Sequence, residues 1–192
     1  MRTAGRSSMK ERSVQYVAFL RAVMVGRKGL SLALLLEAFE SCGAQSPRSF
    51  LATGNVIFRT KTPPARFSLA VARAIQERTG IHEPVFLRTP TELERLQKER
   101  PFDRAPLGPR HELTVTFLPA GIRSARRAPI SGPRGDVEVF WMRTREAFAI
   151  TRLVGGRPGN PGAQIERLLG VKVTTRNWNT IVRLLSASRS AR

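Results

Sequence analysis

VQYVAFLR, residues 14–21, is the stretch from which the fold can be worked out, because its side chains alternate in the manner of a β-strand. Both faces of the expected strand carry apolar side chains, which are Tyr16, Ala18 and Leu20 on one side and Val17 and Phe19 on the other. Helices of the same half of the chain can cover only one face of such a sheet. We therefore expect the other face to pack against the second half of the chain.

The elements after this strand predict a β-α-β-β-α-β order. Ser31 is a suitable N-cap for a helix that ends at Gly43. Two short strands over residues 48–53 and 56–60 are expected to join at Gly54-Asn55, a pair typical of a tight turn. A second helix ending at Gly80 and a strand over 83–88 complete the order of a ferredoxin-like plait.

The second half of the chain predicts a less regular version of the same arrangement. Its expected elements are a strand over 112–118, a hairpin of 136–141 with 146–151, a helix starting at Asn160-Pro161, a short strand over 171–174 and a final helix over 176–185. We predict an α+β fold of two ferredoxin-like (βαββαβ plait) halves, the second degraded and with an extra C-terminal helix.

This interpretation divides the chain into five parts. They are a disordered basic tail (1–13), an N-terminal ferredoxin-like domain (14–89), a helix and linker (90–111), a C-terminal ferredoxin-like domain (112–187) and a disordered tail (188–192). Met9 is a second candidate for the initiating residue.

Composition predicts a soluble, cytoplasmic protein. Hydrophobic residues make up 41% of the chain, enough for a core, and no apolar run has the length of a membrane span. A single cysteine, Cys42, excludes an internal disulfide and fits a reducing compartment. The net charge of +19 favours polyanions, but the basic residues are spread along the whole chain, and only five of the 33 are lysine.

Residues for catalysis or metal binding are few. The two histidines, His82 and His111, are far apart, and no cluster of histidine and cysteine predicts a zinc site. The sequence has neither a G-x-S-x-G elbow nor a G-x-x-x-x-G-K-[ST] loop. We predict no catalytic residue, no metal and no cofactor, and the sequence leaves an enzymatic activity open without favouring one.

Three segments together resemble an uncharacterised, mostly bacterial family, domain of unknown function family 1697. Residues 19–26 (FLRAVMVG) are similar to its LRGINVGG opening, residues 50–58 (FLATGNVIF) to its TYIASGNVIF segment, and residues 175–180 (TRNWNT) to its TRNWNT segment. The resemblance covers roughly residues 14–187 and implies two α/β plaits, with no assigned biochemical role. Met24, Arg27 and Leu32 depart from the family pattern, and Arg27 bears directly on how the first loop would hold a ligand.

These segments, with the loop that continues the first of them to Gly29, supply the candidate ligand-binding residues. They share a basic, polar or turn-forming character and are Arg21, Gly26, Arg27, Lys28, Gly54, Asn55, Arg176 and Asn177. The leading hypothesis is a non-catalytic protein that binds a small anionic ligand in the cleft between the halves. The alternative is a nucleic-acid-binding accessory protein that uses the net charge, and a third is an enzyme with no identifiable base or nucleophile. Each motif also has a structural interpretation, as a turn or a helix cap.

Overall fold

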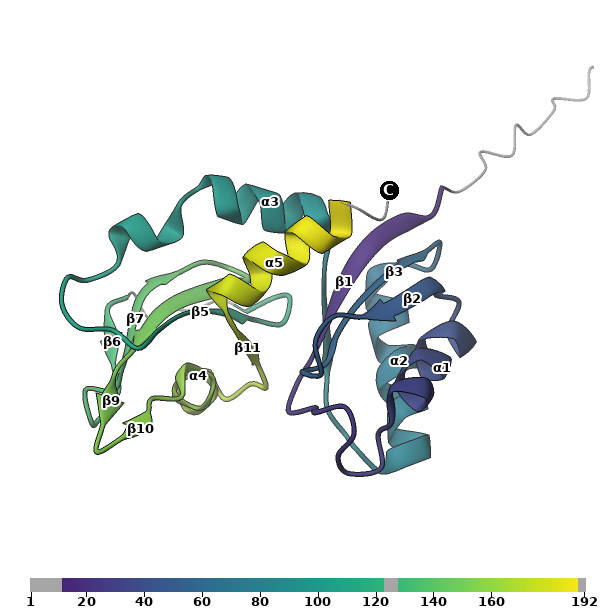
Figure 1. Cartoon of the computed structure of the whole chain (residues 1–192), viewed down its shortest axis with the longest axis horizontal. Coiled ribbons are helices and arrows are strands. Elements are labelled where there is room, and N and C mark those ends of the chain that lie inside the picture. Colours follow the sequence, from purple (N-terminus) through teal and green to yellow (C-terminus); the bar gives the residue numbers. More distant parts are fainter. Residues whose placement is uncertain (1–11, 123–127, 190–192) are drawn as a thin grey trace, which may run out of the picture.

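The computed structural model describes residues 12–122 and 128–189, so most of the two predicted tails lies outside the described residues. It is a mixed α+β structure in which two antiparallel sheets, of four and five strands, lie side by side with helices packed on both (Figure 1), and a third sheet has only two strands. Among the helices in these ranges, none combines the length and apolarity that a bilayer crossing requires.

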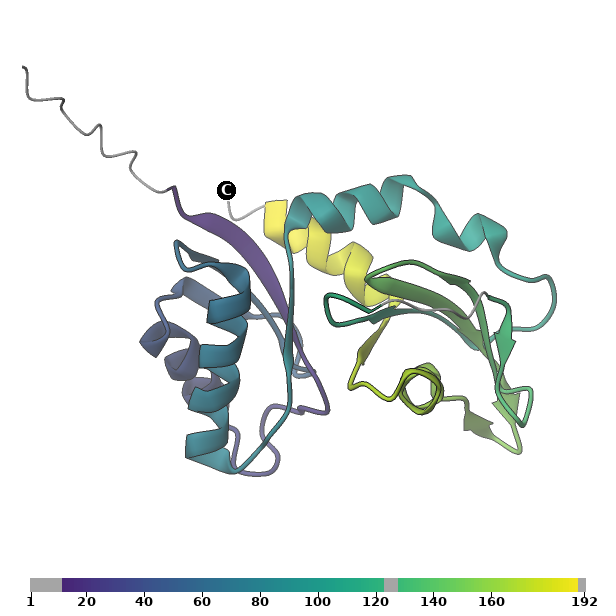
Figure 2. The ribbon, with the colours of Figure 1, turned by 180° about the vertical axis from the view of Figure 1, so that it is seen from behind.

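The N-terminal half follows the predicted order of elements. They are β1 (Val14–Leu20), α1 (Leu32–Ser41), β2 (Gln45–Ser49), β3 (Asn55–Thr60), α2 (Pro64–Thr79) and β4 (Val85–Arg88). The strands pair antiparallel in the order β2-β3-β1-β4, and α1 and α2 cover the outer face of this sheet (Figure 2). Ser31 caps α1 as predicted, since its Oγ accepts a hydrogen bond from Leu34 N–H at 3.1 Å.

The position of β2 differs from the prediction. We expected a strand over 48–53, whereas β2 ends at Ser49 and residues 50–54 form the turn. The reason is local geometry: Leu51 has a φ of 59°, a left-handed conformation that does not continue a strand. The predicted turn pair is therefore split, because Gly54 (φ 70°) closes the turn and Asn55 already belongs to β3.

The C-terminal half holds the remaining elements. They are α3 (Pro90–Lys98), the 3₁₀ turn η1 (Pro101–Arg104), β5 (Glu112–Phe117), β6 (Ile130–Ser131), β7 (Val137–Met142), β8 (Glu146–Thr151), β9 (Leu153–Val154), β10 (Arg157–Pro158), α4 (Pro161–Leu169), β11 (Thr174–Asn177) and α5 (Trp178–Arg189). The larger sheet has the order β11-β5-β8-β7-β6, with α4 on one face and α3 and α5 on the other (Figure 1).

The last two elements begin later than expected. We predicted a strand over 171–174 and a helix from 176, but Arg176 and Asn177 are the last residues of β11, and α5 starts at Trp178. Pairing of β11 with β5 over Thr174–Asn177 satisfies backbone groups that a helix start would leave free. The final helix also runs to Arg189, into the range that we predicted as a tail.

One apolar core joins the two halves, as the two-sided pattern of residues 14–21 predicts. Val17 and Phe19 of β1 are fully buried in it together with Phe117 of β5 and Leu184 of α5. The rings of Phe19 and Phe117 stack with centroids 4.4 Å apart. The inner face of the first sheet is therefore covered, and the loops at its end are held against the second half.

Candidate functional site

Arg176 brings the three motif segments together. Its guanidinium donates six hydrogen bonds, of which four reach the N-terminal half: Nε to Asn55 Oδ1 (2.7 Å), and Nη2 to the carbonyl oxygens of Leu20 (2.7 Å), Thr53 (3.1 Å) and Gly54 (3.4 Å). The other two bind Thr174 Oγ1 and the Thr175 carbonyl within β11. Segments more than 120 residues apart in the sequence therefore meet at one side chain.

The charge of Arg176 is held by neutral oxygens, and no carboxylate of the described residues pairs with it. Burial lowers the pKa of Arg176 to about 10, so the group remains a cation at neutral pH. The guanidinium carbon lies 5.7 Å from the ring centroid of Phe19, which adds a cation–π contact. The Arg176 guanidinium donates its hydrogen bonds to protein oxygens of both halves. It therefore holds the two halves together, and we call this arrangement the clamp.

Asn55 is the central partner in this clamp. The side chain is fully buried, and Nδ2 donates to the Phe50 carbonyl and to Thr53 Oγ1, each at 3.0 Å. These bonds hold the β2–β3 turn, so Asn55 shapes the turn from outside it. Gly54 must lack a side chain here, because a Cβ would lie 3.1 Å from Leu20 Cβ and 3.3 Å from Val23 Cβ, at a positive φ.

Arg21 is engaged elsewhere. Its Nε and Nη2 donate to the two carboxylate oxygens of Glu166 on α4 at 2.6 and 2.9 Å, and Nη1 pairs with Glu83 at 2.6 Å. The hydrogen bond from Arg21 is the main reason that the pKa of Glu166 lies below its usual value, and the same bond raises the pKa of Arg21. Arg21 therefore ties the end of β1 to α4 through Glu166 and to the segment before β4 through Glu83.

Gly26, Arg27 and Lys28 lie in the β1–α1 loop (residues 21–31). We call this loop and the β2–β3 turn (residues 50–54) the loop pair. Val25 N–H donates to the Ala52 carbonyl at 2.9 Å and joins the two loops. Arg27 and Lys28 are exposed, and neither has an acidic partner in the described part of the chain. They are thus the predicted site residues whose cations are available to a ligand.

Asn177 has a structural role in this arrangement. Its Oδ1 accepts a hydrogen bond from Asn179 N–H at 2.9 Å, at the start of α5. This is the capping interaction that the sequence offered as an alternative to ligand binding. The structure therefore brings Gly54, Asn55 and Arg176 together at the clamp. Arg27 and Lys28 lie exposed on the β1–α1 loop, which we call the rim of the loop pair. Arg21 and Asn177 are hydrogen-bonded to other protein groups.

Sequence reasoning missed a second buried arginine between the halves. Arg88 of β4 is 1% exposed, and its Nε donates to Glu146 Oε1 of β8 at 2.8 Å. Nη2 donates to the Arg145 carbonyl at 2.8 Å, and the guanidinium lies over the ring of Phe117. Burial lowers the pKa of Arg88. A signal was present in the sequence, because Arg88 directly follows the apolar strand residues Val85, Phe86 and Leu87.

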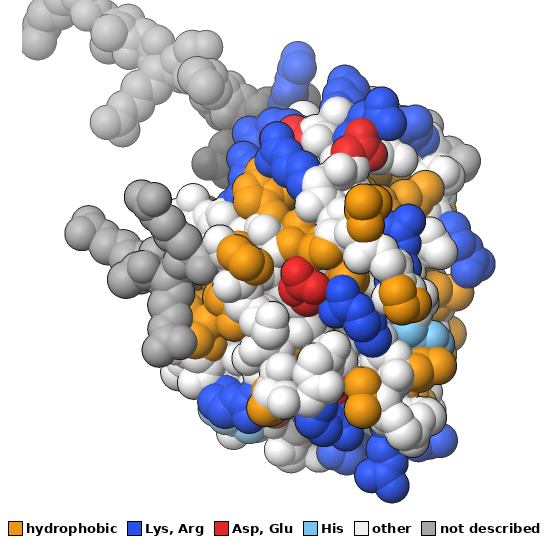
Figure 3. All heavy atoms as spheres, turned by 90° about the vertical axis from the view of Figure 1, so that its left-hand side faces the viewer, with side chains coloured by type: hydrophobic (Ala, Val, Ile, Leu, Met, Phe, Trp, Pro, Cys, Tyr) orange, Lys and Arg blue, Asp and Glu red, His pale blue; other side chains and the backbone are white. Residues whose placement is uncertain are grey.

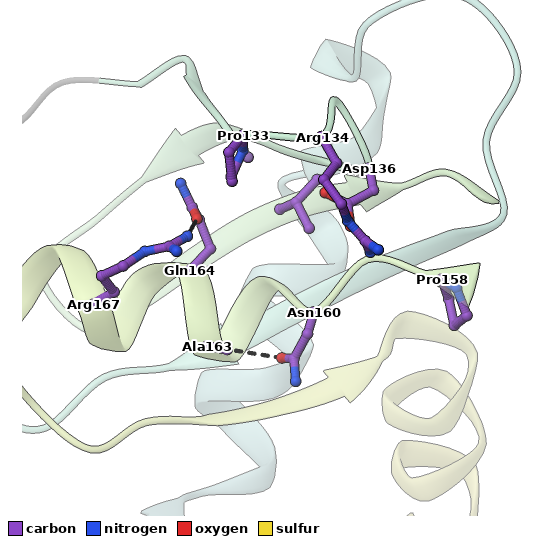
Figure 4. A pocket seen from close by; sticks show the side chains of 10 residues that line it. Pro133, Arg134, Asp136, Pro158, Asn160, Ala163, Gln164 and Arg167 are labelled. Atoms are coloured by element: carbon purple, nitrogen blue, oxygen red, sulfur yellow. Dashed lines mark hydrogen bonds and ion pairs between the residues drawn. The ribbon is translucent and has the colours of Figure 1, made fainter. Parts of the chain in front are cut away.

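Three cavities in the described part of the chain lie away from the predicted site residues. One of about 280 Å³ runs along α4 and the turn after β6, where Arg134 faces Asp136 and Arg167 bends back to Gln164 (Figure 4). Another, of about 370 Å³, lies between α3 and the β7–β8 turn. No group of three or more potential metal ligands occurs within residues 12–122 and 128–189.

Comparisons with known proteins agree with the fold and assign no activity. A solved structure, conserved bacterial protein SP0830 from Streptococcus pneumoniae, aligns with a TM-score of 0.63 over 93% of this chain and 99% of its own, at 14% sequence identity. At that identity the similarity shows the fold alone. No curated protein matches the sequence. The model of the protein family of unknown function DUF1697 matches residues 14–148, a range that leaves out the segment at 175–180, and the chain belongs to this family.

Proposed function

We propose that the protein is a non-catalytic binding protein that holds a small anionic ligand at the loop pair. The observation that carries the proposal is backbone strain. Of the five non-glycine residues with positive φ in the described ranges, three lie in the loop pair: Ala22 (50°), Lys28 (51°) and Leu51 (59°). Such conformations cost about 1–3 kcal/mol each, persist only where the surroundings enforce them, and concentrate at binding and active sites.

The chemistry of the loop pair supports an anion with an apolar portion. Arg27 and Lys28 supply two positive charges that no described carboxylate neutralises. Met24 and Leu51 are 47% and 41% exposed beside them, on loops that hydrogen-bond to each other. The positive end of the α1 dipole follows at Leu32 and adds to the field at the same end of the loop.

In this proposal Arg176 and Asn55 are positioning residues. Arg176 has its donors on protein oxygens. It contacts the β2–β3 turn through the Thr53 and Gly54 carbonyls, and the end of β1, where the other loop starts, through the Leu20 carbonyl. Ordering the loops before the ligand arrives lowers the entropy lost on binding. Ligand contact is therefore assigned to Arg27 and Lys28 on the rim, with Gly26 giving the loop its left-handed turn (φ 88°).

Calorimetric titration of the whole chain with inorganic phosphate and pyrophosphate, at physiological ionic strength, tests the proposal. We expect the Arg27→Ala/Lys28→Ala variant to bind at least about tenfold more weakly, since two cations leave the site. A charge-matched control is Arg66→Ala/Arg73→Ala, two exposed positions on α2. Equal affinity in the two variants, or no binding by the unaltered chain, would refute it.

The alternative, nucleic-acid binding, is favoured by the net charge of +19 alone. The sheet face that plait proteins use to stack bases is buried here against the second half, with Phe19 fully buried and Ile57 4% exposed. On the face seen in Figure 3, arginine and lysine side chains are interspersed with hydrophobic ones and form no continuous stripe. RNA affinity that disappears near 0.15 M salt, without preference for any sequence, would reduce this alternative to charge attraction.

The architecture supports the plait interpretation, which we also propose. The strand order β2-β3-β1-β4 with two helices on one face fits a ferredoxin-like domain over residues 14–89. Strands β11-β5-β8-β7 repeat this order over residues 112–187, with α4 as a packed helix and α5 added. Residues 90–111 would then be the connection between two domains.

A further inference from the structure

Exposed apolar side chains gather on the loop pair and at the start of the helix that follows it. Of the eight large hydrophobic residues exposed in the described ranges, three lie there: Met24 (47% exposed), Leu32 (48%) and Leu51 (41%). Val25 N–H donates to the Ala52 carbonyl at 2.9 Å, so Met24 and Leu51 each precede one residue of a bonded pair. Single exposed apolar residues are normal, whereas several on two joined loops point to an interaction.

Leu51 is unfavourable at its position in two respects. Its φ of 59° lies in the left-handed region, where glycine or asparagine costs less than leucine. The same loops use glycine for this conformation at Gly26, Gly29 and Gly54. The Leu51 side chain is also exposed and belongs to none of the hydrophobic clusters of the described residues. The leucine therefore serves neither the backbone nor the core, which points to a contact outside the fold.

The surroundings of these side chains are positively charged and open. The sequence from residue 12 to residue 36 contains no aspartate or glutamate. Arg27 and Lys28 are exposed and have no acidic partner in the part of the chain that the structure describes. A Cβ added to Gly26 or Gly29 would meet no atom within 4 Å, and the loop reaches the lower edge of the molecule in Figure 1. An anion can therefore approach the two cations from solvent.

We propose that the ligand of the loop pair is an amphiphilic anion, a phosphate or similar oxyanion attached to an apolar chain. The assignment rests on the proposed function, because Arg27 and Lys28 hold the anionic group. Met24, Leu32 and Leu51 contact the chain, and each methylene that they remove from water raises the affinity by up to about fourfold. An inorganic anion would leave these three side chains in water. The same chemistry occurs in a free organic phosphate and in an anionic lipid.

Calorimetric titration of the whole chain with inorganic phosphate and with hexyl phosphate, at physiological ionic strength, tests this ligand class. We expect hexyl phosphate to bind at least about tenfold more tightly, which requires burial of about two of its methylenes. Leu51→Asn should lose most of this preference and keep its affinity for inorganic phosphate. Because asparagine tolerates the left-handed conformation, the variant should melt at the same or a higher temperature. Leu69→Asn, at a 64% exposed leucine on α2, is the matched control and should keep the preference.

The outcomes separate the ligand class from the proposed function. Equal affinity of the unaltered chain for the two compounds, or a full preference for hexyl phosphate in Leu51→Asn, would overturn the amphiphilic ligand. If phosphate binding is lost in Arg27→Ala/Lys28→Ala in that case, the proposed function stands. A preference for hexyl phosphate with full affinity in Arg27→Ala/Lys28→Ala would refute the anionic group, and the proposed function with it.

Vesicles distinguish the two sources of such a ligand. Cosedimentation of the chain with vesicles of phosphatidylcholine and phosphatidylglycerol, reduced in Leu51→Asn and absent with phosphatidylcholine alone, would identify a lipid headgroup. Tight binding of hexyl phosphate without cosedimentation would identify a free organic phosphate. Cosedimentation that is equal in Leu51→Asn and the unaltered chain, without a preference for hexyl phosphate, would show charge attraction only and overturn the inference.

Discussion

Replacing Arg176 with methionine removes the clamp between the halves while keeping a side chain of similar length. Four hydrogen bonds to the N-terminal half are lost, to Leu20, Thr53, Gly54 and Asn55. The Gly54 carbonyl keeps a hydrogen bond from Leu20 N–H at 2.8 Å, and the Leu20 carbonyl keeps one from Thr174 Oγ1 at 3.4 Å. Thr53 is exposed, so water can replace the lost donor there.

The main cost falls on Asn55 Oδ1, which is fully buried and loses its donor. An unsatisfied buried acceptor costs about 1–3 kcal/mol, and the lost charge-assisted bonds add to this. The gain from no longer burying a guanidinium offsets part of the loss. We expect a net decrease of about 3 kcal/mol in the free energy of unfolding, which for a chain of this size lowers the melting temperature by roughly 6–12 °C.

Urea denaturation and thermal melting of Arg176→Met measure this decrease. Arg183→Met is the matched control, because Arg183 is exposed on α5, and it should change stability by less than about 0.5 kcal/mol. A double-mutant cycle with Asn55→Ala should give a coupling of about 1–2 kcal/mol. Equal stability of Arg176→Met and Arg183→Met would refute the clamp.

Three other predictions concern residues that hold the two halves and their loops in place. Because the pKa of Glu166 is lowered in the folded state, its carboxylate stabilises the fold above its unfolded-state pKa of about 4.3, and this stability is lost as the pH falls through the lower folded-state value. Between pH 7 and pH 3 the melting temperature of Arg21→Gln should therefore fall less than that of the unaltered chain. An equal fall in both would contradict this prediction. Gly159→Ala should lower the free energy of unfolding by more than about 3 kcal/mol, because a Cβ would lie 2.2 Å from the Asp136 carbonyl oxygen. The control Gly156→Ala, with open space around it, should cost about 1 kcal/mol. Equal stability of the two variants in chemical denaturation would contradict the close contact between Gly159 and Asp136. Phe19→Ala should cost about 3–5 kcal/mol through loss of the stack on Phe117, and a loss below about 1 kcal/mol would mean that the halves share no tight core.

Much of the fold could be predicted from local patterns. Alternation over residues 14–21 predicts β1, and its apolar residues on both faces predict the packing of Val17 and Phe19 against the second half. Cap chemistry predicts the start of α1 at Ser31 and of α4 at Asn160, because each side chain accepts from a main-chain N–H three residues later. These elements can be predicted because each cap depends only on residues three positions apart in the sequence.

The site could be predicted only in part. Asn55 resembles a turn residue in the sequence, yet its side chain serves a clamp whose other partner is 121 residues away. Arg176 and Asn177 resemble a helix start, and only pairing of β11 with β5 places them in a strand. Arg88 and Glu146 are charged residues expected in water, and their burial depends on each other. Contacts of this kind have no periodic signal.

The central claim is that Arg176 holds the loop pair in the form that binds an anion. Titration of Arg176→Lys with pyrophosphate, at a temperature where the variant is fully folded, tests it most directly. Lysine keeps the charge and leaves Arg27 and Lys28 untouched, but cannot reproduce the planar fork. We predict an affinity at least about tenfold below that of the unaltered chain. An unchanged affinity in a measurably less stable Arg176→Lys variant would contradict the claim.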